Sequence, residues 1–158
     1  EKGTIDAPKW VGPYDDEKLG FYKVAKYYYY PGWWEGGTAI HFFINSAKWQ
    51  GLPKTYQALL TAAAGYVNAD VQAQYDARNP LALKRLVGNG ALLRPFSIPI
   101  MEACLKASEA VNAETSKANA DYKKVWDSIY AFRNDENLWW QVAEYTFENF
   151  MIRTRPKT

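Results

Sequence analysis

The chain has 158 residues, 48% of them hydrophobic, which predicts a packed core in one domain or in part of a larger one and argues against disorder. Nineteen basic and seventeen acidic residues give a net charge of +2 without a basic stripe, so nucleic acid is not an expected partner. The sequence has no apolar run near the ~20 residues that cross a bilayer.

The first residues, Glu1-Lys-Gly-Thr-Ile-Asp-Ala, carry neither an initiator methionine nor the basic-then-apolar pattern of a signal peptide. We therefore expect either a processed chain or a fragment. A fragment would hold only part of a binding site.

The first strongly patterned segment is Lys26-Tyr-Tyr-Tyr-Tyr-Pro-Gly-Trp-Trp-Glu-Gly-Gly, with six aromatic rings and the carboxylate of Glu35. One interpretation is structural: Tyr27 to Tyr30 form a strand that enters a turn at Pro31-Gly32. The other is a ligand pocket, since Tyr and Trp combine an apolar face with a polar tip and Glu35 lies among them.

A buried strand is expected next, over Thr38-Ala-Ile-His-Phe-Phe-Ile-Asn, turned back on the tyrosine strand by Pro31-Gly32. The only histidine, His41, falls inside this apolar pattern, which favours a structural role. Ser46 is a candidate cap for a short helical turn through Trp49 that ends at Gly51.

Composition changes near residue 52, which predicts an aromatic strand region at 1–52 and a helical region at 53–158. The first long helix begins at Pro53, and its apolar residues recur at steps of three and four. Asn79-Pro80 either interrupts that helix or caps a second one over 81–87. A short strand near 91–96 follows.

Three further helices are expected at about 98–117, 120–132 and 136–152, the last beginning near the cap candidate Asp135. This last helix is heavily aromatic from Trp139 to Met151, so we expect it to pack inside a larger body or against another chain. Cys104, the only cysteine, fits a buried structural thiol. These elements predict an α/β protein with few strands and several long helices.

Several kinds of chemistry are not supported by the motifs. With one histidine and one cysteine, a catalytic triad and a tetrahedral zinc site are not expected. A P-loop and a dinucleotide fingerprint are absent from the sequence. A hard cation such as Na⁺ or Ca²⁺ fits better, because Glu35 and backbone carbonyls can bind it together with oxygens of a bound acid. Asp15-Asp16 is a further carboxylate source, although its pattern favours a solvated turn.

Two segments carry a family resemblance: Gly3-Thr-Ile-Asp-Ala-Pro-Lys-Trp-Val-Gly-Pro-Tyr-Asp-Asp-Glu-Lys-Leu-Gly-Phe and the aromatic segment that begins at Lys26. They resemble the DctP-type substrate-binding proteins of TRAP (tripartite ATP-independent periplasmic) transporters, in the branch that binds 2-oxo acids and other small carboxylates. The resemblance continues through Leu52-Pro-Lys-Thr-Tyr-Gln, Leu93-Arg-Pro-Phe and Leu138-Trp-Trp-Gln-Val-Ala-Glu-Tyr-Thr-Phe.

Because members of that family are about twice as long and have two lobes that close on the ligand, the resemblance implies a helix-rich C-terminal portion of such a fold. It implies that region 1–52 is a hinge region that contributes to the ligand cleft. It also implies a periplasmic receptor that binds a small organic acid, such as a 2-oxo or 2-hydroxy carboxylate, and delivers it to TRAP membrane subunits. No enzymatic reaction is implied. Some relatives exchange a C-terminal helix between protomers, so a homodimer through the helix from Trp139 to Met151 is a further implication.

Transferred by position, Trp10 matches the tryptophan that walls the ligand and offers its carbonyl to a Na⁺ or Ca²⁺ ion bridging the ligand, and Glu35 matches a carboxylate ligand of that ion. Trp34 is a further candidate for lining the cleft. The residue before the tryptophan is usually an acid in this branch, but here it is Lys9. Either the Lys9 ammonium replaces the cation beside Glu35, or Lys9 points to solvent and the cation site is damaged.

A competing interpretation is a non-catalytic helical interaction or structural module derived from such a receptor. The two functions differ in one observable feature. A part of a receptor cleft leaves the face around Trp10, Trp34 and Glu35 partly exposed, whereas a self-contained module buries those rings and satisfies Glu35 internally.

Overall fold

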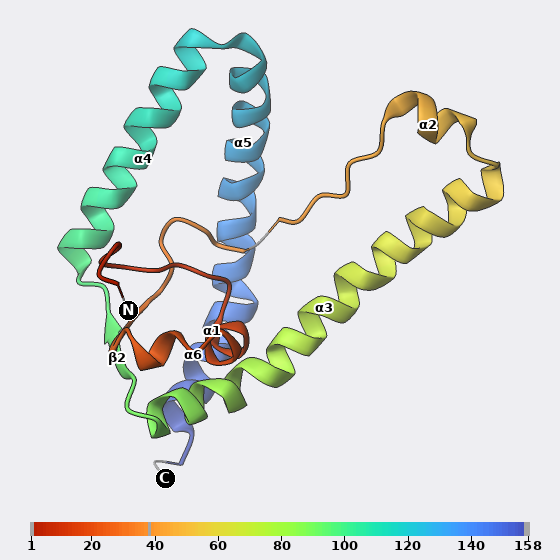
Figure 1. Ribbon diagram of the computed structural model, residues 1–158. Helices are drawn as coiled ribbons and strands as arrows, with labels where there is room; N and C mark the ends of the chain where they lie inside the picture. The colour runs from red at the N-terminus through yellow and green to blue at the C-terminus, as the bar shows by residue number, and fades with distance from the viewer. Residues whose placement is uncertain (1, 38, 157–158) are drawn as a thin grey trace. The chain divides into compact units, whose positions relative to one another are not determined.

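The structure is a computed structural model that describes residues 2–37 and 39–156, and the chain divides into two compact units, Glu1–Ser97 and Ile98–Thr158 (Figure 1). The first unit contains α1 (Pro13–Leu19), a 3-10 turn η1 (Phe21–Lys23), β1 (Tyr27–Tyr30), α2 (Ser46–Gly51), α3 (Lys54–Gly88) and β2 (Leu92–Pro95). The second contains α4 (Ile98–Ala118), α5 (Ala120–Val142) and α6 (Glu144–Thr154). The expected balance of long helices and few strands is confirmed.

The two strands pair in parallel, with Tyr27 opposite Leu92 and Tyr30 opposite Pro95. Backbone hydrogen bonds extend the ladder at both ends, from Leu92 N to the carbonyl of Lys26 at 2.8 Å and from Phe96 N to the carbonyl of Tyr30 at 2.8 Å. The strand expected at 27–30 and the one near 91–96 are therefore confirmed. The two strands are separated in the sequence by α2 and all of α3, so local sequence patterns do not reveal their pairing.

The strand expected at 38–45 is wrong for the residues that the structure describes. Residues 39–45 form no strand, and Ile40 and Phe43 are 86% and 89% exposed; Thr38 lies outside the described residues. A strand needs a neighbouring strand for its backbone hydrogen bonds, and the sheet of the described residues consists of β1 and β2. His41 stacks on Phe43, with ring centroids 5.8 Å apart, on this exposed segment.

A single helix of 35 residues, α3, runs through Asn79-Pro80, so the expected interruption or second cap at this point is wrong. Proline removes one backbone donor from a helix. Burial on its C-terminal side offsets that cost, because Ala82 is fully buried and Leu86 is 1% exposed in the turns that follow Pro80.

The solvated turn expected at Asp15-Asp16 is also wrong: both acids lie in the first turn of α1, and Asp16 is only 8% exposed. The Tyr75 hydroxyl donates to Asp15 at 2.5 Å, and the Tyr28 hydroxyl donates to Asp16 at 2.5 Å. These partners come from α3 and β1, so the local sequence around the acids gave no sign of them.

Glu17 completes the attachment of α1 to α3. The guanidinium of Arg85 donates to both carboxylate oxygens of Glu17, at 2.6 and 2.7 Å, and these hydrogen bonds lower the pKa of Glu17. At the start of α1, the Asn79 side-chain oxygen accepts from the backbone N–H of Tyr14 at 3.0 Å. The helix is thus tied to α3 at both of its ends.

Some helix boundaries differ from the expected ones. Asn45 caps α2 by accepting from Lys48 N at 3.1 Å, one residue before the expected cap at Ser46. In the second unit, α5 continues through Asp135, so no cap is formed there, and α6 begins at Glu144. Cys104 is half-buried on α4 and not fully buried as expected.

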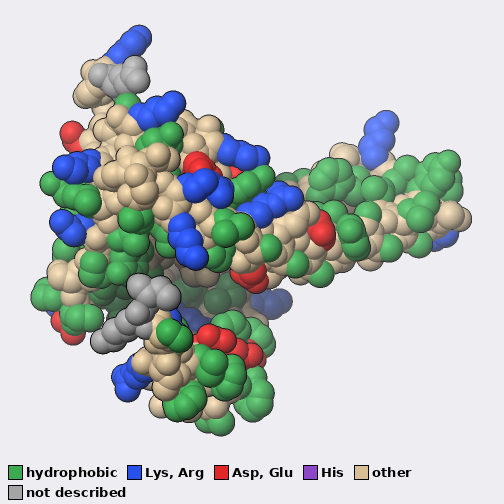
Figure 2. Space-filling view, turned by 90° about the horizontal axis from the view of Figure 1, so that it is seen from below, with side chains coloured by type: hydrophobic (Ala, Val, Ile, Leu, Met, Phe, Trp, Pro, Cys, Tyr) green, Lys and Arg blue, Asp and Glu red, His purple; other side chains and the backbone are tan. Residues whose placement is uncertain are grey.

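The large packed core that the composition predicts is not formed by the described residues, among which the buried apolar side chains are Ala82, Leu86 and Ala91. Figure 2 shows hydrophobic side chains along the arm formed by α2 and the N-terminal part of α3. Tyr56 and Leu59 on this arm are 57% and 61% exposed. None of the described helices is long and apolar enough to span a membrane.

Gly20 ends α1 with a positive φ of 72°, and its N–H bonds the carbonyls of Asp16 and Glu17. Because a side chain is strained in this left-handed conformation, we expect Gly20→Ala to lower the free energy of unfolding by about 1 kcal/mol. Gly65 lies inside α3 with nothing within 4 Å of an added Cβ. Because alanine favours the helix more than glycine does, Gly65→Ala should raise the free energy of unfolding by up to about 1 kcal/mol. Urea unfolding of both variants measures this, and changes of the same sign would contradict it.

Burial raises the pKa of Asp16, more than the hydrogen bond from Tyr28 lowers it. The folded protein therefore holds this proton more tightly than the unfolded chain does, and the contribution of Asp16 to stability is lost as pH rises through the raised pKa. The variant Asp16→Asn has no ionisable group at this position. We expect the free energy of unfolding of the variant minus that of the parent chain to become more positive from about pH 4 to pH 7. Urea unfolding at both pH values measures it, and a constant difference would contradict the assignment.

Candidate ligand-binding site

Lys9 and Glu35 meet although 26 residues separate them, because the Lys9 ammonium donates a hydrogen bond to Oε2 of Glu35. Lys9 precedes α1, which is docked on α3, and Glu35 follows β1, which is paired with β2. Both attachments are needed to bring the two side chains together. The pair remains accessible, with the Lys9 side chain 47% exposed and the Glu35 side chain 28% exposed.

Trp34, which directly precedes Glu35 in the chain, is held by aromatic contacts. Its ring meets Phe96 edge to face at 6.2 Å between centroids and meets Trp33 edge to face at 5.5 Å. Phe96 in turn stacks on Tyr29 at 5.1 Å. Edge-to-face and offset-stacked pairs are the favoured arrangements of aromatic rings, so this cluster fixes the orientation of Trp34.

The side chains of Tyr27–Tyr30 point alternately to the two sides of the strand, as in any β-strand. Tyr28 faces α1 and bonds Asp16, and burial together with this acceptor raises the pKa of Tyr28. Tyr29 points to the other side and stacks on Phe96. The structural interpretation of the segment is thus right for Tyr28, while Tyr29 supports the position of Trp34.

The predicted ring positions are partly exposed. Trp10 is 53% exposed and Trp34 is 45% exposed. Trp10 follows Lys9 directly in the chain, so its backbone lies next to the Lys9–Glu35 pair. This exposure is the feature expected of part of a receptor cleft, whereas the Lys9–Glu35 contact, which satisfies Glu35 within the chain, is the feature expected of a self-contained module.

Phe96 is the residue of this cluster that sequence reasoning missed as a site element. The sequence predicts it only as part of the short strand near 91–96. Its place within Leu93-Arg-Pro-Phe was a signal, but nothing in the sequence indicated that this segment would lie beside Trp34.

The described residues do not by themselves form a calcium site. No group of three or more acidic, histidine or cysteine side chains among them is placed to hold a metal ion. Asp15 and Asp16 accept from tyrosines, and the Glu35 carboxylate is in contact with an ammonium. Calcium takes six to eight oxygen ligands, so the Glu35 carboxylate would supply only part of its coordination shell.

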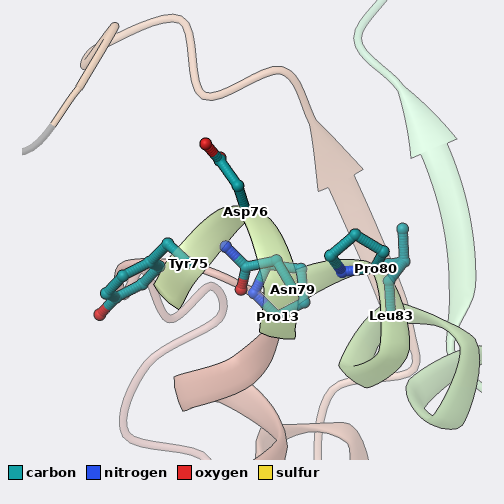
Figure 3. A pocket seen from close by; sticks show the side chains of 6 residues that line it. All are labelled: Pro13, Tyr75, Asp76, Asn79, Pro80 and Leu83. Carbon is teal, nitrogen blue, oxygen red and sulfur yellow. The ribbon is translucent and has the colours of Figure 1, made fainter. Parts of the chain in front are cut away.

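A separate open pocket of about 340 Å³ lies where the start of α1 meets α3 (Figure 3). None of the predicted site residues lines it. Gln72 donates to Asp76 at 3.0 Å, so the acid in the pocket has a partner on its own helix. The lining residues are Pro13, Tyr75, Asp76, Asn79, Pro80 and Leu83.

The family model "Bacterial extracellular solute-binding protein, family 7", DctP, matches residues 1–119. The chain belongs to the DctP family. Members of this family are substrate-binding receptors, and the helix-rich α/β fold class predicted from the sequence is confirmed by the solved relative described next.

Two relatives are informative. A monocarboxylate 2-oxoacid-binding periplasmic protein of Nostoc sp. (strain PCC 7120) is 44% identical over 150 residues, which are 95% of this chain and 41% of that protein. A TRAP transporter solute-binding protein from Bordetella bronchiseptica RB50 is 47% identical with a TM-score of 0.93, over 96% of this chain and 45% of that one. Its crystal structure is a mixed-occupancy dimer with copurified calcium and picolinate in one active site, the other being apo.

This DctP-family chain therefore spans less than half the length of the relatives it matches. Its identity with both is high enough to transfer the fold of the matched part. What the whole relatives bind remains a property of the complete proteins.

Proposed function

We propose that this chain forms part of a periplasmic receptor that binds a small organic acid, such as a 2-oxo or 2-hydroxy carboxylate, for delivery to TRAP membrane subunits. In this proposal Lys9, Trp10, Trp34 and Glu35 are ligand-binding residues. The receptor makes and breaks no bond in its ligand, so it is not an enzyme.

The observation that carries the proposal is the Lys9–Glu35 pair beside partly exposed tryptophans. An ammonium that is 47% exposed can donate to a ligand carboxylate as well as to Glu35. The tryptophan faces offer the apolar surface that a small acid needs on its other side. Both named relatives add support, because one binds 2-oxoacids by its name and the other holds picolinate.

The alternative is a non-catalytic helical interaction or structural module derived from such a receptor. The wide apolar exposure of α3 favours it, because such a surface suits an interaction with a partner. The Lys9–Glu35 contact, which satisfies Glu35 within the chain, also favours it, while the accessible rings of Trp10 and Trp34 favour the receptor.

A chimera tests the receptor proposal. Residues 1–156 replace the matched 45% of the Bordetella receptor, which supplies the rest of the cleft. We expect the chimera to bind picolinate or pyruvate in isothermal titration calorimetry, and Trp34→Ala to weaken binding at least about tenfold through loss of one aromatic wall.

Trp140→Ala is the matched control, because Trp140 lies on α5 in the other compact unit and bonds only Glu136 among the described side chains. Its affinity for the acid should be unchanged. A chimera that folds by circular dichroism and binds neither acid would rule out the receptor proposal and leave the structural module.

We further propose a homodimer through α6. Its apolar side chains are exposed, with Phe147 at 62% and Phe150 at 63%. An apolar helix face of this kind is stable only when another surface covers it. The solved relative, a dimer, supports a second copy as the partner.

Phe150→Glu should convert a dimer of this chain into a monomer, because it would bury an unpaired charge in the interface. Glu148→Gln on the same helix is the control and should leave the dimer intact. Light scattering after size-exclusion chromatography measures both. A monomeric parent chain whose α6 is protected from hydrogen exchange would decide against the dimer.

A further inference from the structure

Lys9 places a positive charge on the one acidic side chain that the family resemblance assigns to a bridging cation. Its ammonium donates to Oε2 of Glu35, from a segment that precedes α1. In the solved relative, 47% identical to this chain, calcium accompanies the bound picolinate. Calcium thus places positive charge in the acid-binding site of that relative, and the Lys9 ammonium places positive charge beside Glu35 in this chain.

We propose that the Lys9 ammonium replaces the divalent cation in this chain, so that it binds a small carboxylate without a metal. This inference rests on the proposed receptor function and deepens it. Lys9 then bridges Glu35 and the ligand carboxylate, as a metal cation bridges two anionic groups.

The donor geometry of lysine suits this part. An ammonium has three N–H donors on one rotating group, and one of them is directed at Glu35. The Lys9 side chain is 47% exposed, so a carboxylate can approach the same nitrogen from the solvent side. Two carboxylates can then share one ammonium through charge-assisted hydrogen bonds.

The same geometry disfavours calcium. An ion bound to Glu35 would lie within a few ångströms of the Lys9 ammonium, and the two positive charges would repel each other. This repulsion favours the ammonium over the ion.

The test is the chimera of residues 1–156 in the Bordetella receptor, titrated with picolinate in the presence of about 1 mM Ca²⁺ or of excess EGTA. We expect its affinity to change less than about twofold between the two conditions. Lys9→Asp removes the ammonium and adds a carboxylate. This variant should bind picolinate at least about tenfold more tightly with Ca²⁺ than with EGTA.

Lys9→Arg keeps the positive charge and should bind in EGTA as it does in Ca²⁺. Lys48→Asp on α2 is the matched control for a lysine-to-acid change, and it should leave binding metal-independent. Titration of the acid-free chimera with Ca²⁺ alone gives a readout besides ligand binding: heat of calcium binding is expected for Lys9→Asp and not for the parent chimera.

The outcomes separate the two proposals. No binding of picolinate or pyruvate in either condition, with a folded chimera, overturns the receptor proposal itself. Binding that is lost in EGTA for the chimera carrying Lys9 overturns the metal-independent site and leaves the receptor intact. In that second case, Lys9 turns to solvent when calcium binds at Glu35.

Discussion

The attachment of α1 to the C-terminal half of α3 is the constraint on which the rest of the first unit depends. The contacts are spread along α1: Tyr14 N bonds Asn79, Asp15 accepts from Tyr75, and Glu17 accepts a two-pronged hydrogen bond from Arg85. Since α3 leads into β2 and α1 leads into β1, the same contacts set the parallel pairing of the strands.

The candidate site follows from that frame. Lys9 lies just before the anchored helix, and Glu35 lies just after the paired strand, so the ion pair joins two segments that are already close. Phe96, at the end of β2, orients Trp34 from the other side. The site is therefore built by long-range contacts, and its residues come from three segments of the chain.

Local structure was largely predictable from the sequence, because short-range patterns determine it. The strand at Tyr27–Tyr30 and the helix after Ala120 follow from alternation and helical periodicity. What could not be predicted depends on distant partners. The local pattern predicts a solvated Asp16 because its hydrogen-bond donor, Tyr28, lies on β1 and not on the same helix. It predicts a helix end at Pro80 because local sequence does not show that Leu86 is buried.

The site shows the same division. Lys9 and Glu35 were identified from a family resemblance, and their contact was one of two alternatives that the sequence left open. The residues 39–45 illustrate the limit most clearly: their pattern is that of a buried strand, yet Ile40 and Phe43 are exposed in this chain. Such a pattern predicts burial, but burial also needs a neighbouring surface, and the described residues do not cover Ile40 and Phe43.

Most large apolar side chains of the described residues are exposed to solvent, while the polar contacts between α1 and α3 position the segments that carry Lys9 and Glu35. The described chain thus combines an accessible Lys9–Glu35 pair with a large exposed apolar surface.

The most direct test is a crystal structure of the chimera grown with picolinate and calcium, with data collected to detect the anomalous scattering of calcium. The result we predict is a picolinate carboxylate within hydrogen-bond distance of Lys9 Nζ and no anomalous peak at Glu35. A calcium peak between Glu35 and picolinate, with Lys9 turned to solvent, would contradict it.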